Sequence, residues 1–373
     1  MLKVLLILIF IRPFISSLAF PYLNSFYSVL ILSFLTIWFM YKKVPLGKFK
    51  NLRYPLILFS LSVIISVAFS NDRLVSSWES YKYISGLLLF LIAAALDWNE
   101  KMLVIRTAAL TGLVIGLLAI YQALFGFRHL LEYVAQQGIS DPFVLEYVAR
   151  KRVFLPFVTP NMLAGYLIMV IPLALIDKKT IWFTVPMSMA LLLTRSIGAL
   201  LSICLALGLY FYLQEKVKKR TVLLLIGILM ITGLVFLSRS DTQKQHLRPI
   251  FSTLMRLGYW QDTLKIIKAN ALTGVGIGNF NLMQSRYAHN SYLQIWTEMG
   301  IMGIASIVWL IIAVFKSALK DIRGFTHRKE VSGLITGGCA FLVHNLIDFS
   351  FFLPEISLIW WLILGLSLDL NRA

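Results

Sequence analysis

Residues 102–125, MLVIRTAALTGLVIGLLAIYQALF, form an apolar run with one basic side chain and no acidic one. The run is long enough to cross a bilayer, because a membrane-spanning helix needs about 20 mainly apolar residues. The whole chain shares this character: 59% of its 373 residues are hydrophobic, 14% are charged, and its mean hydropathy is +0.80. Soluble domains carry about 25% charged residues. The composition therefore excludes a soluble globular protein and a disordered chain, and it predicts a polytopic membrane protein.

Charged clusters and Pro, Gly, Asn or Asp breaks divide the sequence into about twelve apolar runs. In the first run Arg12-Pro13 interrupts the apolar stretch and no cleavage site follows clearly, so we interpret it as a retained helix and not as a signal peptide. We expect an all-α fold with a single membrane domain over residues 1–373 and about twelve transmembrane helices. The expected spans are 4–21, 26–41, 55–70, 79–96, 102–125, 161–176, 180–195, 197–214, 221–237, 291–315, 331–347 and 355–370.

The net charge of +18 is distributed unevenly between the two sides of these spans. Basic residues collect in the connecting segments 42–53, 178–179 and 216–220. The turns 22–25 and 348–354, on the other side, contain no basic residue. Short cytoplasmic loops collect Lys and Arg in this way. We therefore expect both termini in the cytoplasm, and we attribute most of the charge to topology and not to nucleic-acid binding.

Two segments on the expected outer side are long, about 126–160 and about 238–290. The second is basic, although that side usually disfavours positive charge. Apolar residues in it recur at helical spacing and predict an amphipathic helix over about 249–269, on the membrane surface or against the bundle. These apolar residues are Ile250, Leu254, Leu257, Leu264 and Ile267.

A group of polar residues stands where this second segment meets the membrane. His289 and Asn290 directly precede the span at 291–315, and Arg256, Tyr259 and Trp260 lie on neighbouring turns of the predicted helix. A lone histidine in this position often only caps a helix. The basic segment that converges on the same side favours a functional role for His289.

Two further arginines belong to this side. Arg195 stands in a short outer turn, where it either reaches lipid phosphates or binds an anionic ligand through its guanidinium group. Arg152 closes the basic run 150–152, which is either a solvated face or a third cation of the site. Asn161, at the start of the next span, is positioned to cap that helix.

His344 and Asp348 lie four residues apart at the outer end of the span at 331–347. Ionisable groups at membrane depth are candidates for function, although a hydrogen bond between two packed side chains explains this pair equally well. The sequence Gly274-Val275-Gly276-Ile277-Gly278-Asn279-Phe280 lacks the third glycine of a dinucleotide fingerprint and predicts a tight turn. No pattern of metal ligands occurs, and we expect neither a metal nor a cofactor.

These motifs together resemble the superfamily of O-antigen ligases and O-antigen polymerases, which are bacterial envelope glycosyltransferases. The resemblance extends over roughly residues 150–370. The stretches that carry it are RVFLPFVTPNMLAGYL (152–167), LTRSIGALL (193–201), RLGYWQDTLKIIKANALTGVGIGNF (256–280), HNSYLQIWTEMGIMGI (289–304) and HNLIDFSFFLP (344–354).

The resemblance implies an inverting, metal-independent glycosyltransferase with a GT-C-like helical bundle in the bacterial inner membrane. Such an enzyme takes its glycan from undecaprenyl diphosphate on the periplasmic side, and the ligases transfer it to a sugar hydroxyl of lipid A-core. By motif, His289 is the expected catalytic residue, and Arg195, Arg256 and Arg152 are expected at the donor diphosphate. Supporting positions are Asn290, Asn161, Tyr259, Trp260, His344 and Asp348.

Other functions remain open from the sequence. Polymerases and protein O-glycosyltransferases of the superfamily use the same donor with similar motifs. A transporter or flippase for a lipid-linked anion would need the same arginines without any reaction, although no internal repeat typical of transporters occurs.

Overall fold

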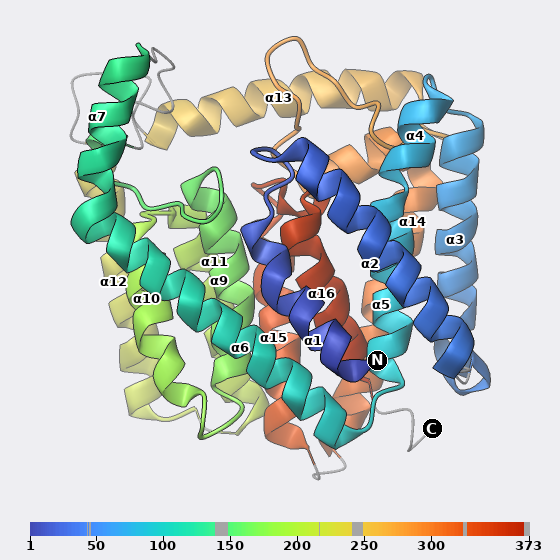
Figure 1. Cartoon of the computed structure of the whole chain (residues 1–373), viewed down its shortest axis with the longest axis horizontal. Helices are drawn as coiled ribbons and strands as arrows, with labels where there is room; N and C mark the ends of the chain where they lie inside the picture. The colour runs from blue at the N-terminus through green and yellow to red at the C-terminus, as the bar shows by residue number, and fades with distance from the viewer. Residues whose placement is uncertain are drawn as a thin grey trace.

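The computed structural model describes residues 1–42, 44, 46–138, 148–215, 217–240, 249–323 and 327–368. These residues form a bundle of helices, most of which run between two opposite ends of the molecule (Figure 1). The described residues contain no strand, and their one isolated β-bridge joins Leu282 and Ser285. The expectation of an all-α fold is confirmed.

The amino-terminal part of the chain begins with short and long helices in alternation. Its elements are α1 (Leu2–Ile11), η1 (Arg12–Phe14), α2 (Pro21–Lys42), η2 (Leu46–Leu52), α3 (Arg53–Ala68), α4 (Arg73–Glu79), α5 (Tyr81–Ala94), α6 (Trp98–Tyr121), the π-helical segment η3 (Gln122–Gly126) and α7 (Phe127–Gln137).

The carboxy-terminal part carries all the motifs quoted above. Its elements are α9 (Pro160–Ala174), η4 (Ile181–Phe183), α10 (Thr184–Leu193), α11 (Ile197–Leu213), α12 (Lys219–Ser240), α13 (Pro249–Ala269), α14 (Ser291–Arg323), α15 (Arg328–His344), η6 (Ser350–Phe352) and α16 (Pro354–Leu366).

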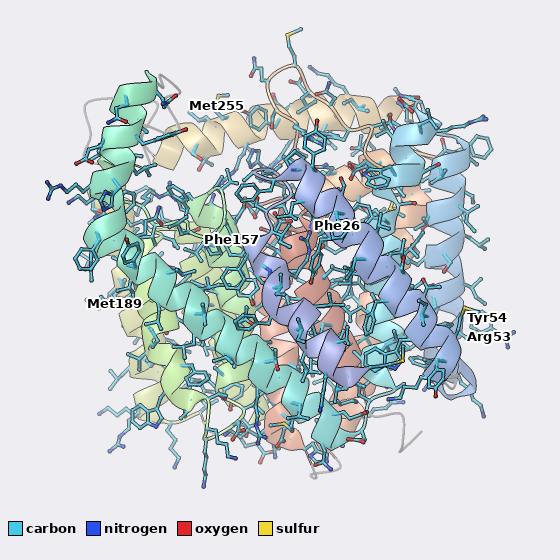
Figure 2. All side chains as sticks on the ribbon, viewed as in Figure 1. Phe26, Arg53, Tyr54, Phe157, Met189 and Met255 are labelled. Atoms are coloured by element: carbon cyan, nitrogen blue, oxygen red, sulfur yellow. The ribbon has the colours of Figure 1, made fainter. Side chains whose placement is uncertain are left out.

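Five described helices are long and apolar enough to cross a membrane: Pro21–Lys42, Phe49–Ala68, Trp98–Val134, Lys219–Ser238 and Ser291–Lys320. Shorter apolar helices accompany them at Pro160–Ala174, Ile181–Leu193, Ile197–Leu213 and Pro354–Leu366. Large apolar side chains such as Phe26, Tyr54 and Met189 are exposed on the outside of the bundle (Figure 2). So apolar a periphery is suited to lipid and not to water. The protein is an integral membrane protein, and the number of twelve spans stays a prediction.

The expected first span, 4–21, is wrong as a continuous helix. Helix α1 ends at Ile11, and Arg12 opens the short helix η1 with Pro13 behind it. The guanidinium group of Arg12 is buried, where it donates to the carbonyl of Ile15 and the side chain of Asn24 and lies 3.6 Å from a carboxylate oxygen of Glu355. A charged group at this depth must be paired. The chain therefore breaks its helix at the residue that needs these partners.

The centre of the bundle is formed by α16, α15 and α9, whose residues are almost completely buried. Small residues let the helices approach closely there. A Cβ atom on Gly365 of α16 would lie 2.3 Å from the carbonyl oxygen of Phe90 in α5, and one on Gly86 would lie 2.4 Å from the indole ring of Trp361. In the same way, a Cβ atom on Gly337 of α15 would lie 2.5 Å from the carbonyl oxygen of Met169 in α9, so these two helices are also in close contact.

Helix α13 lies across one end of the bundle, away from the amino terminus (Figure 1). Its bounds, Pro249–Ala269, confirm the predicted helix over 249–269. The side that packs on the bundle carries Thr263 and Ile267, whereas Leu254, Leu257 and Leu264 are exposed. Most of the expected apolar face is therefore turned away from the bundle. The contact instead depends on a neighbouring face of the helix, which also contains Arg256 and Tyr259.

The two long outer segments are described only in part. The first, 126–160, includes α7, while its residues 139–147 lie outside the described part of the chain. In the second, 238–290, Lys244 and Arg248 lie outside the described residues. That these two basic residues contribute to the positive charge on the outer side stays a prediction.

Candidate active site

His289 lies at the junction between the segment that follows α13 and the start of α14. Its backbone is in the left-handed region, with φ of 52°. The cap of α14 is the next residue, because the side-chain oxygen of Asn290 accepts from the amides of Tyr292 at 3.0 Å and Leu293 at 3.1 Å. An Asx cap of this kind satisfies amides that have no partner inside the helix. His289 itself is therefore not needed as a cap, and its ring is turned toward other groups.

The imidazole ring of His289 is held between two aromatic rings. It stacks on Tyr259 of α13, with centroids 5.7 Å apart and an interplanar angle of 22°, and it meets the edge of Phe349 at 4.9 Å. Its Nδ1 atom is buried and has no hydrogen-bond partner among the described residues. Phe349 was not singled out by sequence. A buried ring nitrogen without a partner is uncommon, and such atoms often belong to functional sites.

The surroundings of His289 favour its neutral form. Burial and, to a smaller extent, the positive charge of Arg256 lower the pKa of His289 to about 4, although the carboxylate of Asp348 partly offsets both effects. The imidazole of His289 is therefore surrounded by residues from two distant parts of the sequence. Arg256 and Asp348 change its pKa, and Tyr259 stacks on it. Of the residues expected at the site, these are the ones that the structure brings to His289.

His344 and Asp348 form a buried pair beside this group, each with a side chain 2% exposed. Nε2 of His344 and Oδ2 of Asp348 are 3.6 Å apart, beyond hydrogen-bond distance, so the alternative of a hydrogen bond between the two side chains is wrong. The carboxylate of Asp348 instead accepts from the amide and the hydroxyl of Ser350. The ring of His344 packs against the first turns of α9 and α11, where a Cβ atom on Gly165 would lie 3.2 Å from it and one on Gly198 3.7 Å.

Arg152 is fixed at the same end of the bundle, where α9 and α11 begin. Its side chain is buried and donates to the carbonyl of Thr194 at 3.0 Å and to the side-chain oxygen of Asn161 at 3.4 Å. The same oxygen of Asn161 accepts from the hydroxyl of Ser196 at 3.0 Å. The expectation of a solvated basic run is wrong for Arg152. Its bonds instead connect the residues on both sides of Arg195.

Asn161 does not cap α9, and this expectation is corrected by the structure. The cap is Thr159, whose side chain accepts from the amide of Met162, with Pro160 in the first turn. Proline suits this position because its missing amide would have had no helical partner. Asn161 is thereby released to bind Arg152 and Ser196.

Arg195 occupies the turn between α10 and α11 and is half-buried. Its φ of 50° places it in the left-handed region, which is uncommon for a residue other than glycine, asparagine or aspartate. Helices α9 and α11 both begin at this end, and helix amino termini attract anions through their free amides and the helix dipole. Arg195, the buried Arg152 and these helix ends give this side of the site a strongly positive character.

Trp260 lies next to Tyr259 on α13. Its indole Nε1 atom is buried and has no hydrogen-bond partner among the described residues. The ring nitrogen is thus a free donor on the same helix that carries Arg256 and the ring stacked on His289.

The glycine-rich stretch 274–278 forms the tight turn that the sequence predicts. Gly274, Gly276 and Gly278 all have positive φ, between 74° and 102°. A Cβ atom on Gly274 would lie 2.5 Å from the backbone of Glu298, and the amide of Gly278 donates to the Glu298 carboxylate at 3.0 Å. The stretch thus fastens the segment before His289 onto α14.

Sequence reasoning missed the bonds that join the start of α14 to the end of α15. The side-chain oxygen of Asn345 accepts from the hydroxyl of Ser291 at 2.7 Å and from the amide of Phe351 at 3.0 Å. Ser291 and Asn345 both belong to stretches that begin with His-Asn, at 289 and at 344. This repeated pair of residues was the available sequence signal for the contact. The two motifs meet in space, which places Phe349 and Asp348 at His289. Among the described residues, no group of three or more His, Cys, Asp or Glu side chains is arranged to hold a metal ion.

No curated protein matches the chain. Residues 182–308 match a family model described as O-Antigen ligase. The match includes Arg195, Arg256 and His289, and it indicates a glycosyltransferase-like enzyme of the O-antigen ligase or polymerase type, with lipid-linked glycan and lipid A-core as the partners general to the family. The resemblance to the O-antigen ligase and O-antigen polymerase superfamily is thereby confirmed.

Proposed function

We propose that the protein is an inverting, metal-independent O-antigen ligase of the bacterial inner membrane. It transfers a glycan from undecaprenyl diphosphate to a sugar hydroxyl of lipid A-core on the periplasmic face. The observation that carries this proposal is the single imidazole of His289, held without a hydrogen-bond partner for Nδ1 in the field of Arg256. The family match over residues 182–308 supports the same class of reaction.

His289 acts as the general base. The acceptor hydroxyl attacks the anomeric carbon of the donor, its proton passes to the imidazole, and the new glycosidic bond forms as the bond from carbon to the diphosphate oxygen breaks. The bonding electrons leave with the diphosphate. One displacement at the anomeric carbon inverts its configuration. Proton transfer by a positioned base typically contributes a rate factor of roughly 10²–10⁴.

The arginines stabilise the leaving group. Arg195 and Arg256 bind the diphosphate, and Arg152 supports them through its bonds to Thr194 and Asn161. Guanidinium groups bind phosphate oxygens bidentately and keep their charge in a site with little water. Charge that develops on the diphosphate in the transition state is thus neutralised by groups already in place, and no general acid is required.

Donor binding also prepares the base. With the site empty, burial and Arg256 hold the pKa of His289 near 4. A bound diphosphate supplies negative charge beside Arg256 and so raises the pKa of the imidazole toward neutrality. The base becomes stronger when there is a donor to react with, which limits wasteful activation of water in the empty site.

The location suits a lipid-linked donor. The undecaprenyl diphosphate group lies at the headgroup level, and the site lies at the end of the bundle that α13 crosses (Figure 1). Basic residues collect at the opposite end, which supports cytoplasmic termini and a periplasmic site. The all-helical bundle is compatible with a GT-C-like architecture.

The second candidate is an O-antigen polymerase, which uses the same donor, and the two are distinguished by the products that accumulate in cells lacking the protein. Long glycan chains left on undecaprenyl diphosphate are the result expected for a ligase. Single repeat units left on the lipid would instead identify a polymerase. If the protein were a flippase, cells lacking it would keep the lipid-linked substrate on the cytoplasmic leaflet, where a periplasmic glycosidase cannot reach it.

A further inference from the structure

A second polar site adjoins His289 on the side of α4 and α5. It is a cavity of about 30 Å³ between the starts of α5 and α14. A volume of this size takes one or two groups as large as water, and hence the hydroxyl edge of a sugar but not a whole ring. Its polar lining consists of Glu79, Lys82, Tyr83, Arg286, Tyr287, Gln294 and Glu298.

The charged groups of this cavity balance each other. Lys82 forms an ion pair with Glu79, and the exposed Arg286 stands at the rim. The carboxylate of Glu298 is held by Gln294, whose amide donates to it at 3.0 Å, and by the amide of Gly278 at 3.0 Å. Two carboxylates and two cations give no net formal charge. The cavity therefore does not select an anion, in contrast to the arginines on the other side of His289.

Tyr83 supplies the observation that points to a ligand. Its side chain is 4% exposed, it lines the cavity, and its hydroxyl has no hydrogen-bond partner among the described residues. Leaving a buried hydroxyl without a partner is costly, on the order of 1–3 kcal/mol. A bound hydroxyl group would satisfy it, because phenol and sugar hydroxyls both donate and accept.

The cavity is coupled to His289 through rings and through the backbone. Tyr287, in the cavity wall, stacks on Phe349 with centroids 4.2 Å apart, and the ring of Phe349 meets that of His289 nearly at a right angle, with centroids 4.9 Å apart. Gln294 accepts from the amide of Ala288, the residue next to His289, at 3.1 Å. The rings of Tyr287 and Phe349 thus connect the wall of the cavity to the base.

From these contacts we propose that the cavity is the acceptor subsite, which holds hydroxyl groups of a neutral sugar of the acceptor while the attacking hydroxyl, on another part of the same acceptor glycan, reaches His289. This inference rests on the proposed transferase function. Inversion requires the attacking hydroxyl and the leaving diphosphate on opposite sides of the anomeric carbon. The elements fit this requirement, since the residues for the acceptor lie on α4, α5 and α14, and the arginines for the diphosphate lie at α9 to α11 and on α13. Figure 1 shows α4 and α5 on one side of the central helices and α10 and α11 on the other.

The test compares Tyr83 with Tyr166, a second buried tyrosine that lies outside the cavity. Tyr166 in α9 is also buried, its hydroxyl also has no partner among the described residues, and it does not line the cavity. Purified Tyr83→Phe and Tyr166→Phe proteins in lipid nanodiscs are assayed with lipid-linked glycan as donor and delipidated core oligosaccharide as acceptor. We expect Tyr83→Phe to raise KM for the oligosaccharide by up to about tenfold, as for the loss of one hydrogen bond, and to leave KM for the donor unchanged. Tyr166→Phe is expected to behave as wild type.

A Glu79→Gln variant tests the same cavity a second time. Its KM for the oligosaccharide is expected to rise, while its KM for the donor stays the same. Thermal unfolding of each variant, compared with wild type, separates a weakened subsite from a misfolded protein. If wild type transfers glycan and both cavity variants keep its KM for the acceptor, the subsite is refuted and the proposed function stands. If wild type itself transfers no glycan, the proposed function fails and the acceptor role fails with it.

Discussion

The imidazole of His289 stacks on the ring of Tyr259, with centroids 5.7 Å apart, although 29 positions of sequence separate the two residues. The contact exists because α13 lies across the end of the bundle and turns its Tyr259 face inward. It also brings Arg256, one turn earlier on the same helix, into the electrostatic surroundings of His289. Helix α13 therefore supplies both the ring of Tyr259, which packs against the base, and the positive charge of Arg256, which we propose binds the donor.

The first prediction concerns pH. Because the pKa of His289 in the free protein is lowered to about 4, the imidazole is neutral at every pH well above 4. The acidic limb of kcat/KM, which reports the free enzyme, is expected near pH 4 and not near the ordinary histidine value of about 6.5. Replacing Arg256 with Gln removes a positive charge and should move this limb to higher pH. A limb unaffected by Arg256→Gln would show that another group titrates.

The arginines are expected to depend on their geometry as well as on their charge. Lysine keeps the charge but loses the bidentate fork, so Arg195→Lys and Arg256→Lys should each raise KM for the lipid-linked donor. The matched control is Arg128→Lys on α7, because the Arg128 side chain is 86% exposed and pairs with its helical neighbour Glu132. Initial-rate kinetics at varied donor concentration measures the effect. Wild-type kinetics in both site variants would remove these arginines from the donor site.

The link between α14 and α15 is expected to matter for stability. Asn345→Ala removes the acceptor for the Ser291 hydroxyl and the Phe351 amide, and it leaves the buried Phe351 amide unpaired, while the Ser291 hydroxyl keeps only its bond to the carbonyl of Asp348 at 3.1 Å. The expected cost is about 1–3 kcal/mol for the unpaired amide, seen as a lower Tm of the purified protein. An Asn345→Ala protein with wild-type Tm would show that the bonds contribute little.

Metal independence is tested by chelation. If cationic side chains alone stabilise the diphosphate, EDTA should leave the rate of transfer by purified protein unchanged. The same assay with added Mg²⁺ serves as the comparison. A reaction that stops with EDTA and returns with Mg²⁺ would contradict the proposed mechanism.

Much of this architecture could be predicted from the sequence. Apolar runs located most helices, and helical spacing gave the bounds of α13, because both signals are local. The orientation of α13 could not be predicted in the same way. The sequence left open whether its apolar face lies on the membrane surface or against the bundle, and in the structure Thr263 and Ile267 pack inward while Leu254, Leu257 and Leu264 are exposed.

The site shows the same limit. Motifs identified His289, Arg195 and Arg256, but the role of each neighbour depends on three-dimensional contacts. Asn161 was expected to cap a helix and instead accepts from Arg152 and Ser196, because Thr159 takes the capping position. Phe349 and Tyr83 carried no sequence signal, since an aromatic residue in a membrane helix or turn is ordinary. Only the fold places them at the base and in the adjoining cavity.

The most direct test of the account is the rate of glycan transfer by purified His289→Ala protein, measured together with its Kd for the lipid-linked donor. The matched control is His129→Ala, which replaces an exposed histidine of α7. We predict that His289→Ala lowers the rate of transfer by roughly 10²–10⁴ while donor Kd stays within about twofold, since the arginines that bind the diphosphate are untouched. A His289→Ala protein that transfers glycan at the wild-type rate would contradict the central claim that this imidazole is the base.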